Sequence, residues 1–159
     1  VFIPLVTPFD ESGEVDYAGL RANTEALASA CDGKDFVFAP AGTTGEVFSL
    51  SLEEHREVVA AVVDVVAGRF PVIAGASATG TRETVRLAKA MQQAGADGVM
   101  VLPPYYVIPN EEGVFRHYLE IAASVDVGIV VYNHPGVSGA WIGPSLMARL
   151  AQIENIGAC

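Results

Sequence analysis

The feature that most constrains the fold is a regular alternation of short apolar runs with amphipathic helical stretches. The apolar runs predict strands at Phe2–Thr7, Phe36–Ala41, Val72–Ala76, Val99–Leu102, Val127–Tyr132 and from Ile156 onward. Helical periodicity predicts helices at Asp16 to about Ala30, Leu52–Ala67, Thr81 to about Ala94, Glu111 to about Ser124 and Pro144–Ala151. Apolar strands separated by helices are typical of a parallel sheet that is buried on both faces.

Several of the predicted helices carry recognisable start signals. Ser51 and Glu54 form a capping-box pattern, in which each side chain satisfies a backbone amide of the first turn. Asn110 is expected to cap the helix at Glu111, and Thr81 to cap the helix that it begins.

Two α/β architectures fit this pattern: an open doubly wound sheet and a (β/α)8 TIM barrel. A whole barrel needs about 250 residues, so 159 residues would cover roughly the first five βα units and the start of strand 6. An open sheet of five or six strands would fit the length without remainder. Because the sequence stops within a predicted strand, a truncated barrel is favoured, in which residues 1–159 would be the N-terminal portion of a single TIM-barrel domain. Periodicity alone leaves both architectures open.

Charge and composition exclude several classes of function. A formal charge of -10 argues against nucleic acid or an anionic membrane as the partner. The apolar runs are too short to span a bilayer, and no signal peptide is visible. Cys31 and Cys159 lie far apart without ligand-like neighbours, so we expect no metal site and a reducing, cytoplasmic setting.

The polar and aromatic residues gather where the predicted strands end. Parallel α/β folds place their active sites at these carboxyl ends, and this asymmetry indicates an enzyme. The segments concerned are Thr7–Phe9, "GTTGE" (Gly42–Glu46), Gly75–Ser77, "PPYY" (Pro103–Tyr106) and "YNHPG" (Tyr132–Gly136).

The GTTGE segment predicts a tight loop with converging backbone amides and two hydroxyl groups. Such a nest suits a carboxylate or a phosphate, although a Gly-rich turn that only connects a strand to a helix is the alternative. Tyr106 and Tyr132 could relay protons, with packing of the amphipathic ring as the alternative. His134 could act as a base, with a polar surface position as the alternative. His55 and His117 fall within helices, where a structural role is expected.

Taken together, these motifs resemble one known family. "VTPF" (Val6–Phe9), "GTTGE", "PVIAG" (Pro71–Gly75), "GADGVMVLPPYY" (Gly95–Tyr106) and "VYNHPG" (Val131–Gly136) occur in the order found in the dihydrodipicolinate synthase / N-acetylneuraminate lyase family. These are pyruvate-dependent class I aldolases, and the resemblance extends over all 159 residues.

The resemblance implies a (β/α)8 barrel that assembles as a homotetramer and needs no separate cofactor. A lysine on the sixth strand would form a Schiff base with pyruvate. "NIGAC" (Asn155–Cys159) aligns with the family pattern that precedes this lysine, which is therefore expected immediately after Cys159. Residues 1–159 alone are expected to be inactive.

The resemblance also implies roles for individual residues. Gly42, Thr43 and Thr44 would bind the substrate carboxylate, and Thr43 would also link Tyr132 into a catalytic proton relay. Tyr106 would reach into the site of a neighbouring subunit and complete that relay.

The segment after Tyr132 departs from the synthase pattern. Val137 stands where synthases usually carry an arginine that grips the carboxylate of the aldehyde substrate. Ser138 is closer to the sialic-acid lyase branch, and "GEVFSLSLEEH" (Gly45–His55) resembles the sugar-acid dehydratases. His134, Val137 and Ser138 are the candidate residues for contact with the second substrate.

We therefore expect a Schiff-base carbon-carbon lyase, aldolase or synthase that acts on pyruvate, or another 2-keto acid, with an aldehyde or sugar-acid substrate. A keto-deoxy sugar-acid dehydratase and a barrel that lacks the lysine and only binds ligands are the alternatives within this fold. A complete flavodoxin-like binding domain is a further alternative, but "VTPF" offers no phosphate nest after the first strand.

Overall fold

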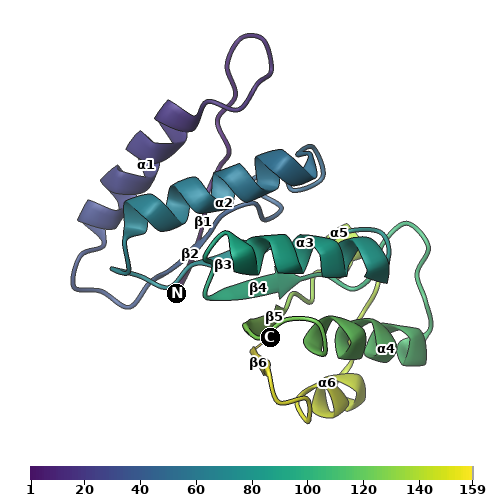
Figure 1. Ribbon diagram of the computed structural model, residues 1–159. Coiled ribbons are helices and arrows are strands. Elements are labelled where there is room, and N and C mark those ends of the chain that lie inside the picture. The colour runs from purple at the N-terminus through teal and green to yellow at the C-terminus, as the bar shows by residue number, and fades with distance from the viewer. Residues whose placement is uncertain (159) are drawn as a thin grey trace.

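The computed structural model describes residues 1–158 and shows alternating strands and helices (Figure 1). Cys159 lies outside the described residues. The strands are β1 Phe2–Pro4, β2 Val37–Ala39, β3 Ile73–Gly75, β4 Gly98–Val101, β5 Gly128–Val131 and β6 Ile156–Ala158. The helices are α1 Tyr17–Ala30, α2 Leu52–Val66, α3 Thr81–Gln93, α4 Glu111–Ala122, α5 Pro135–Ser138 and α6 Pro144–Leu150.

All the strand pairings between these elements are parallel, and the strands follow one another in chain order. β1 pairs with β2, and β3 to β6 pair successively. A single parallel bridge between Phe38 and Val72 joins the two groups. A doubly wound sheet reverses its strand order at a switch point, whereas this order runs without reversal from β1 to β6, as in a barrel wall.

The helices form one layer that follows the strands around. α1 packs on α2, α2 on α3, α3 on α4, and α4 on α6 (Figure 1). Side chains on the helix-facing side of the strands are almost completely buried, as in Phe38, Val99 and Ile129. The alternate residues Ile73, Met100 and Val130 are only half-buried, because they point to the opposite, concave face of the sheet.

Most predicted elements are confirmed to within a few residues. The capping box of Ser51 and Glu54 forms, and Asn110 accepts a hydrogen bond from the amide of Gly113. The cap predicted at Thr81 is wrong, since Gly80 occupies the cap position and no side chain caps the helix. The Thr81 hydroxyl instead lies 3.0 Å from Nδ1 of His117 on α4.

The predicted strands are longer than the observed ones at their carboxyl ends. Thr7, Ala41, Ala76 and Tyr132 lie beyond the strands and already belong to the following loops. The short helix α5 was not predicted. These loop residues are apolar or β-prone, so local pattern alone cannot separate them from the strands that they follow.

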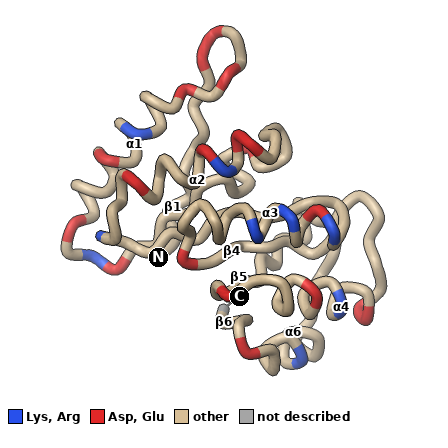
Figure 2. The backbone as a smooth tube through the Cα atoms, in the orientation of Figure 1, with Lys and Arg blue, Asp and Glu red and all other residues tan. Residues whose placement is uncertain are grey.

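Charged residues lie on the helices and connecting loops and not on the strands (Figure 2). Arg21 on α1 pairs with Asp64 on α2, and Glu25 on α1 pairs with Arg69 in the loop after α2. These pairs are largely exposed, so each contributes at most about 1 kcal/mol to stability. None of the helices within residues 1–158 is long and apolar enough to cross a bilayer.

Candidate active site

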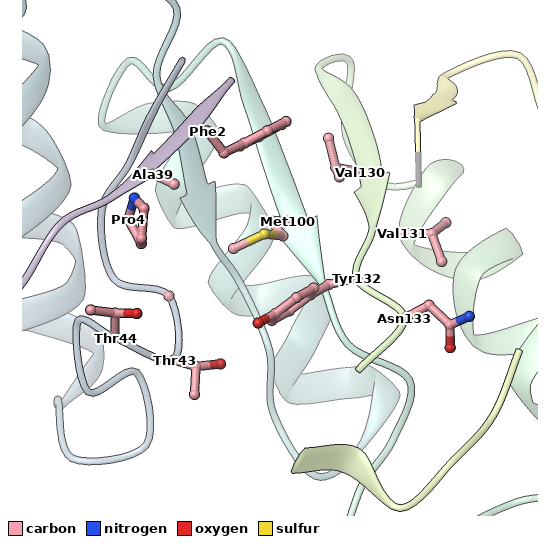
Figure 3. A pocket seen from close by; sticks show the side chains of 11 residues that line it. Phe2, Pro4, Ala39, Thr43, Thr44, Met100, Val130, Val131, Tyr132 and Asn133 are labelled. Carbon is pink, nitrogen blue, oxygen red and sulfur yellow. The ribbon is translucent and has the colours of Figure 1, made fainter. Parts of the chain in front are cut away.

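A cavity of about 450 Å³ opens on the concave face of the sheet, between the ends of β1, β2, β4 and β5 (Figure 3). Its size lies in the range of pockets that bind small molecules. Eleven residues line it: Phe2, Pro4, Ala39, Gly42, Thr43, Thr44, Met100, Val130, Val131, Tyr132 and Asn133. None of these residues is charged, so an anion here would have to be held by amides and hydroxyls.

The loop Gly42–Gly45, which follows β2, supplies one wall of the cavity. It is a succession of turns in which the Glu46 amide donates to the Thr43 carbonyl at 3.2 Å and the Val47 amide to the Gly42 carbonyl at 3.1 Å. Within residues 1–158, the amides of residues 42–45 donate to no backbone carbonyl. These free amides are the donors that an anion-binding nest requires.

The Thr43 hydroxyl is buried and has no hydrogen-bond partner among the described residues. A buried hydroxyl without a partner is costly, and such groups are often completed by a ligand or by water. The orphaned hydroxyl therefore supports a polar ligand in this cavity.

Tyr132 leaves β5 at the opposite wall. Its amide donates to the Val101 carbonyl at 2.8 Å. This hydrogen bond continues the pairing of β5 with β4 and fixes the position of the Tyr132 backbone, from which the side chain extends. In Figure 3 the Tyr132 hydroxyl points toward Thr43 and Thr44 across the cavity. The fold thus brings together Gly42, Thr43, Thr44 and Tyr132, which were predicted from separate segments.

The remaining predicted site residues do not line the cavity. His134 is exposed, and its ring packs edge-on against Tyr132 with the centroids 5.6 Å apart. Val137 is half-buried on α5. Ser138 is buried, and its hydroxyl accepts a hydrogen bond from the Ala140 amide at 3.2 Å.

Tyr106 is 92% exposed and has a left-handed backbone with φ of 73°. Val107 and Ile108 beside it are also exposed. The predicted role of Tyr106 in a neighbouring subunit's site stays a prediction.

Sequence reasoning missed Asn133 as a site residue. Its side-chain amide donates to the Ile142 carbonyl at 3.0 Å and accepts from the Ile142 amide at 3.1 Å. These two hydrogen bonds close the segment that carries His134, Val137 and Ser138. The signal was its place directly after Tyr132 in "YNHPG", but nothing local indicates Ile142 as its partner.

Residues 1–158 contain no cluster of three or more His, Cys, Asp or Glu side chains that could hold a metal ion.

Comparison with known proteins places this geometry in a family. The sequence model of the Dihydrodipicolinate synthetase family matches residues 1–159. The chain belongs to the dihydrodipicolinate synthetase family.

Curated relatives from this family are similar over nearly the whole chain. The 4-hydroxy-tetrahydrodipicolinate synthase of Archaeoglobus fulgidus is 43% identical over 152 residues, which are 96% of this chain and 50% of the relative. The enzyme of the same name from Methanothrix thermoacetophila is 43% identical over 158 residues, which are 99% of this chain and 52% of the relative. The chain therefore spans about half the length of the curated relatives it matches.

Solved structures agree with this membership of the dihydrodipicolinate synthetase family. Dihydrodipicolinate synthase from Aquifex aeolicus superposes with a TM-score of 0.89 at 39% identity, covering 98% of this chain and 52% of that one. The chloride-inhibited enzyme from Acinetobacter baumannii complexed with pyruvate has a TM-score of 0.92 at 36% identity, covering 99% of this chain and 53% of that one. The six strands are thus part of a (β/α)8 barrel.

Proposed function

We propose that the protein containing this chain is a pyruvate-dependent, Schiff-base-forming carbon-carbon synthase or lyase of the 4-hydroxy-tetrahydrodipicolinate synthase type. One observation carries the proposal: the free loop amides and the unpartnered Thr43 hydroxyl lie on one wall of an uncharged cavity, and Tyr132 lies on the opposite wall. The names of the relatives support it.

The carboxylate of pyruvate would be bound by the loop. The amides of Thr43 and Thr44, with their hydroxyls, offer donors to both carboxylate oxygens, and the apolar side chains of Met100 and Val130 exclude water around the rest of the substrate. A small keto acid bound in this way would present its ketone carbon toward β5 and β6.

The amine of the lysine expected after Cys159 would attack that ketone carbon. Imine formation requires the ketone oxygen to leave as water, and a proton must reach that oxygen. The Tyr132 hydroxyl, which points into the cavity toward Thr43, is the group that we assign to this transfer. When a C–C bond breaks, the protonated imine accepts the electron pair of that bond and becomes an enamine. When a C–C bond forms, the imine first loses a proton from its methyl carbon, and the resulting enamine donates the electron pair to the aldehyde carbon, whose oxygen takes up a proton.

The second substrate would be an aldehyde bound near the segment after β5. Because residue 137 is valine, no arginine grips a carboxylate at this position. The aldehyde would be oriented by the loop that Asn133 closes, with His134 at its exposed edge.

We also propose that the site is completed by a second subunit of a homotetramer. The exposed run Tyr106–Ile108 is the surface that supports this assembly, because three adjacent apolar or aromatic side chains at 92%, 74% and 52% exposure are unfavourable in water.

Borohydride trapping of the full-length protein with pyruvate tests the proposal. The expected result is a reduced pyruvate adduct on the lysine directly after Cys159, located by peptide mass mapping. Omitting pyruvate is the control and should leave that peptide unmodified. An unmodified peptide in the presence of both pyruvate and borohydride would contradict the Schiff-base mechanism.

A further inference from the structure

We infer that Thr7 is a positioning residue that sets the geometry of the loop Gly42–Gly45, an inference that rests on the proposed carboxylate-binding role of this loop. Thr7 is 6% exposed, and its hydroxyl donates to the Gly45 carbonyl at 2.8 Å. The bond joins the loop after β1 to the loop after β2, 38 residues away in the chain. Thr7 does not line the cavity, so it acts through the loop.

The loop needs external support because its backbone is strained on both sides. Ala41 has φ of 52° and Glu46 has φ of 57°, a left-handed conformation that residues with a Cβ rarely adopt. Neighbouring backbone must therefore hold the loop in place.

The start of the loop is held by β3. The Gly75 amide donates to the Pro40 carbonyl at 2.9 Å, and a Cβ on Gly75 would lie only 2.0 Å from the Ala41 carbonyl oxygen. This close backbone contact fixes the entrance of the loop without any side chain.

The end of the loop is held by Thr7. Among the described residues, its bond to Gly45 is the only side-chain hydrogen bond to residues 42–45. The peptide unit that carries the Gly45 carbonyl also carries the Glu46 amide, which donates to the Thr43 carbonyl. Thr7 therefore orients the peptide that closes the turn onto Thr43, the residue whose hydroxyl lacks a partner within residues 1–158.

The chain provides a matched control for this bond. Thr24 is also buried, and its hydroxyl also donates to a backbone carbonyl, that of Leu20, at 2.8 Å. Thr24 lies within α1 and does not line the cavity. Thr7→Val and Thr24→Val thus each remove one buried hydrogen bond from a hydroxyl to a backbone carbonyl, and only the first touches the loop.

The experiment measures the pyruvate KM, kcat and thermal stability of the full-length enzyme. We expect Thr7→Val to raise the pyruvate KM by about three- to tenfold, the factor that corresponds to one buried hydrogen bond. Thr7→Ser keeps the hydroxyl and should have the wild-type KM. Thr24→Val should lower thermal stability and leave the pyruvate KM unchanged. An unchanged KM in Thr7→Val, or equal KM values in both valine variants, would overturn the inference.

Two further measurements keep the test decisive. If Thr7→Val does not fold, Thr7→Ala replaces it, because the smaller side chain lets water reach the Gly45 carbonyl. An alanine variant with the wild-type KM would count against the inference. If the wild-type enzyme forms no trapped pyruvate adduct, the proposed function has failed, and amide hydrogen exchange at Glu46 tests the tether alone. Faster exchange in Thr7→Val than in Thr24→Val supports it, and equal exchange rejects it.

Discussion

At the scale of single residues, the cavity is built from polar groups that the fold leaves without protein partners. The Thr43 hydroxyl is buried and unpaired, and the loop amides beside it are free of backbone acceptors within residues 1–158. Leaving such groups unpaired costs free energy, which ligand binding can recover. The Tyr132 hydroxyl faces them, so the proposed proton donor and the proposed anion site line the same cavity.

We predict that Tyr132→Phe folds normally but lowers kcat by about 10²–10⁴-fold, the usual contribution of a positioned acid or base. Borohydride trapping of pyruvate should slow in parallel, because imine formation needs the same proton. The measurement is steady-state and single-turnover kinetics on the full-length enzyme.

Tyr118→Phe is the control for this prediction. Tyr118 is buried, burial raises the pKa of its phenol, and its hydroxyl donates to the Val101 carbonyl at 2.8 Å, outside the cavity. This variant should lose stability and keep kcat. Equal losses of kcat in both variants would show that Tyr132 acts through packing alone.

At the scale of elements, α3 and α4 are joined by a partly buried polar contact between Thr81 and His117. The His117 ring is 2% exposed, and its Nε2 has no partner among the described residues. Burial lowers the pKa of His117 to about 4, because a charged imidazolium would be desolvated between the helices. The folded protein therefore holds the ring neutral near pH 7.

This burial predicts a loss of stability in acid. The unfolded imidazole has a pKa near 6.5, so between about pH 6.5 and pH 4 the unfolded state binds the proton and the folded state does not. The free energy of unfolding should therefore fall with decreasing pH in this window, by up to about 3 kcal/mol from His117. Denaturant titrations at several pH values measure it.

The variant His117→Gln should show a shallower dependence on pH than the wild type. Burial also lowers the pKa of His55, which accounts for a remaining slope. Thr81→Val removes the partner and keeps the imidazole, so it should keep the full slope at lower overall stability. A wild-type slope in His117→Gln would contradict the assignment.

At the scale of the whole molecule, the strands run in chain order and the helices cover only their outer side. The concave face carries half-buried apolar residues and the candidate site. On another part of the surface, Tyr106–Ile108 is exposed. In the proposed tetramer this run is an interface, and assembly would be coupled to activity through Tyr106.

We predict that Val107→Asp dissociates the proposed tetramer and lowers kcat together with it, because a carboxylate would be buried at the interface. Analytical ultracentrifugation and kinetics of the full-length enzyme measure the two effects. Leu119→Asp, at a 45% exposed position on α4, is the control and should change neither. An unchanged mass and an unchanged kcat in Val107→Asp would contradict both the proposed interface and the proposed contribution of Tyr106 to the site.

The sequence by itself determined the elements of this protein and the segments that carry its chemistry. Periodicity located the strands and long helices, since alternating burial of side chains is a local property of the chain. The five motifs identified the family, and they placed Gly42, Thr43, Thr44 and Tyr132 at strand ends. The cap at Thr81 failed because its hydroxyl is used by His117, 36 residues away.

Only the tertiary structure decided between an open sheet and a barrel wall, because strand order depends on pairings such as Phe38 with Val72. The tertiary structure also decided which strand-end residues line the same cavity. It brought Thr7 into a hydrogen bond with Gly45, and Asn133 into a hydrogen bond with Ile142. These contacts join residues that no local pattern relates. Their geometry follows from how the strands stack side by side, which is a property of the packed molecule.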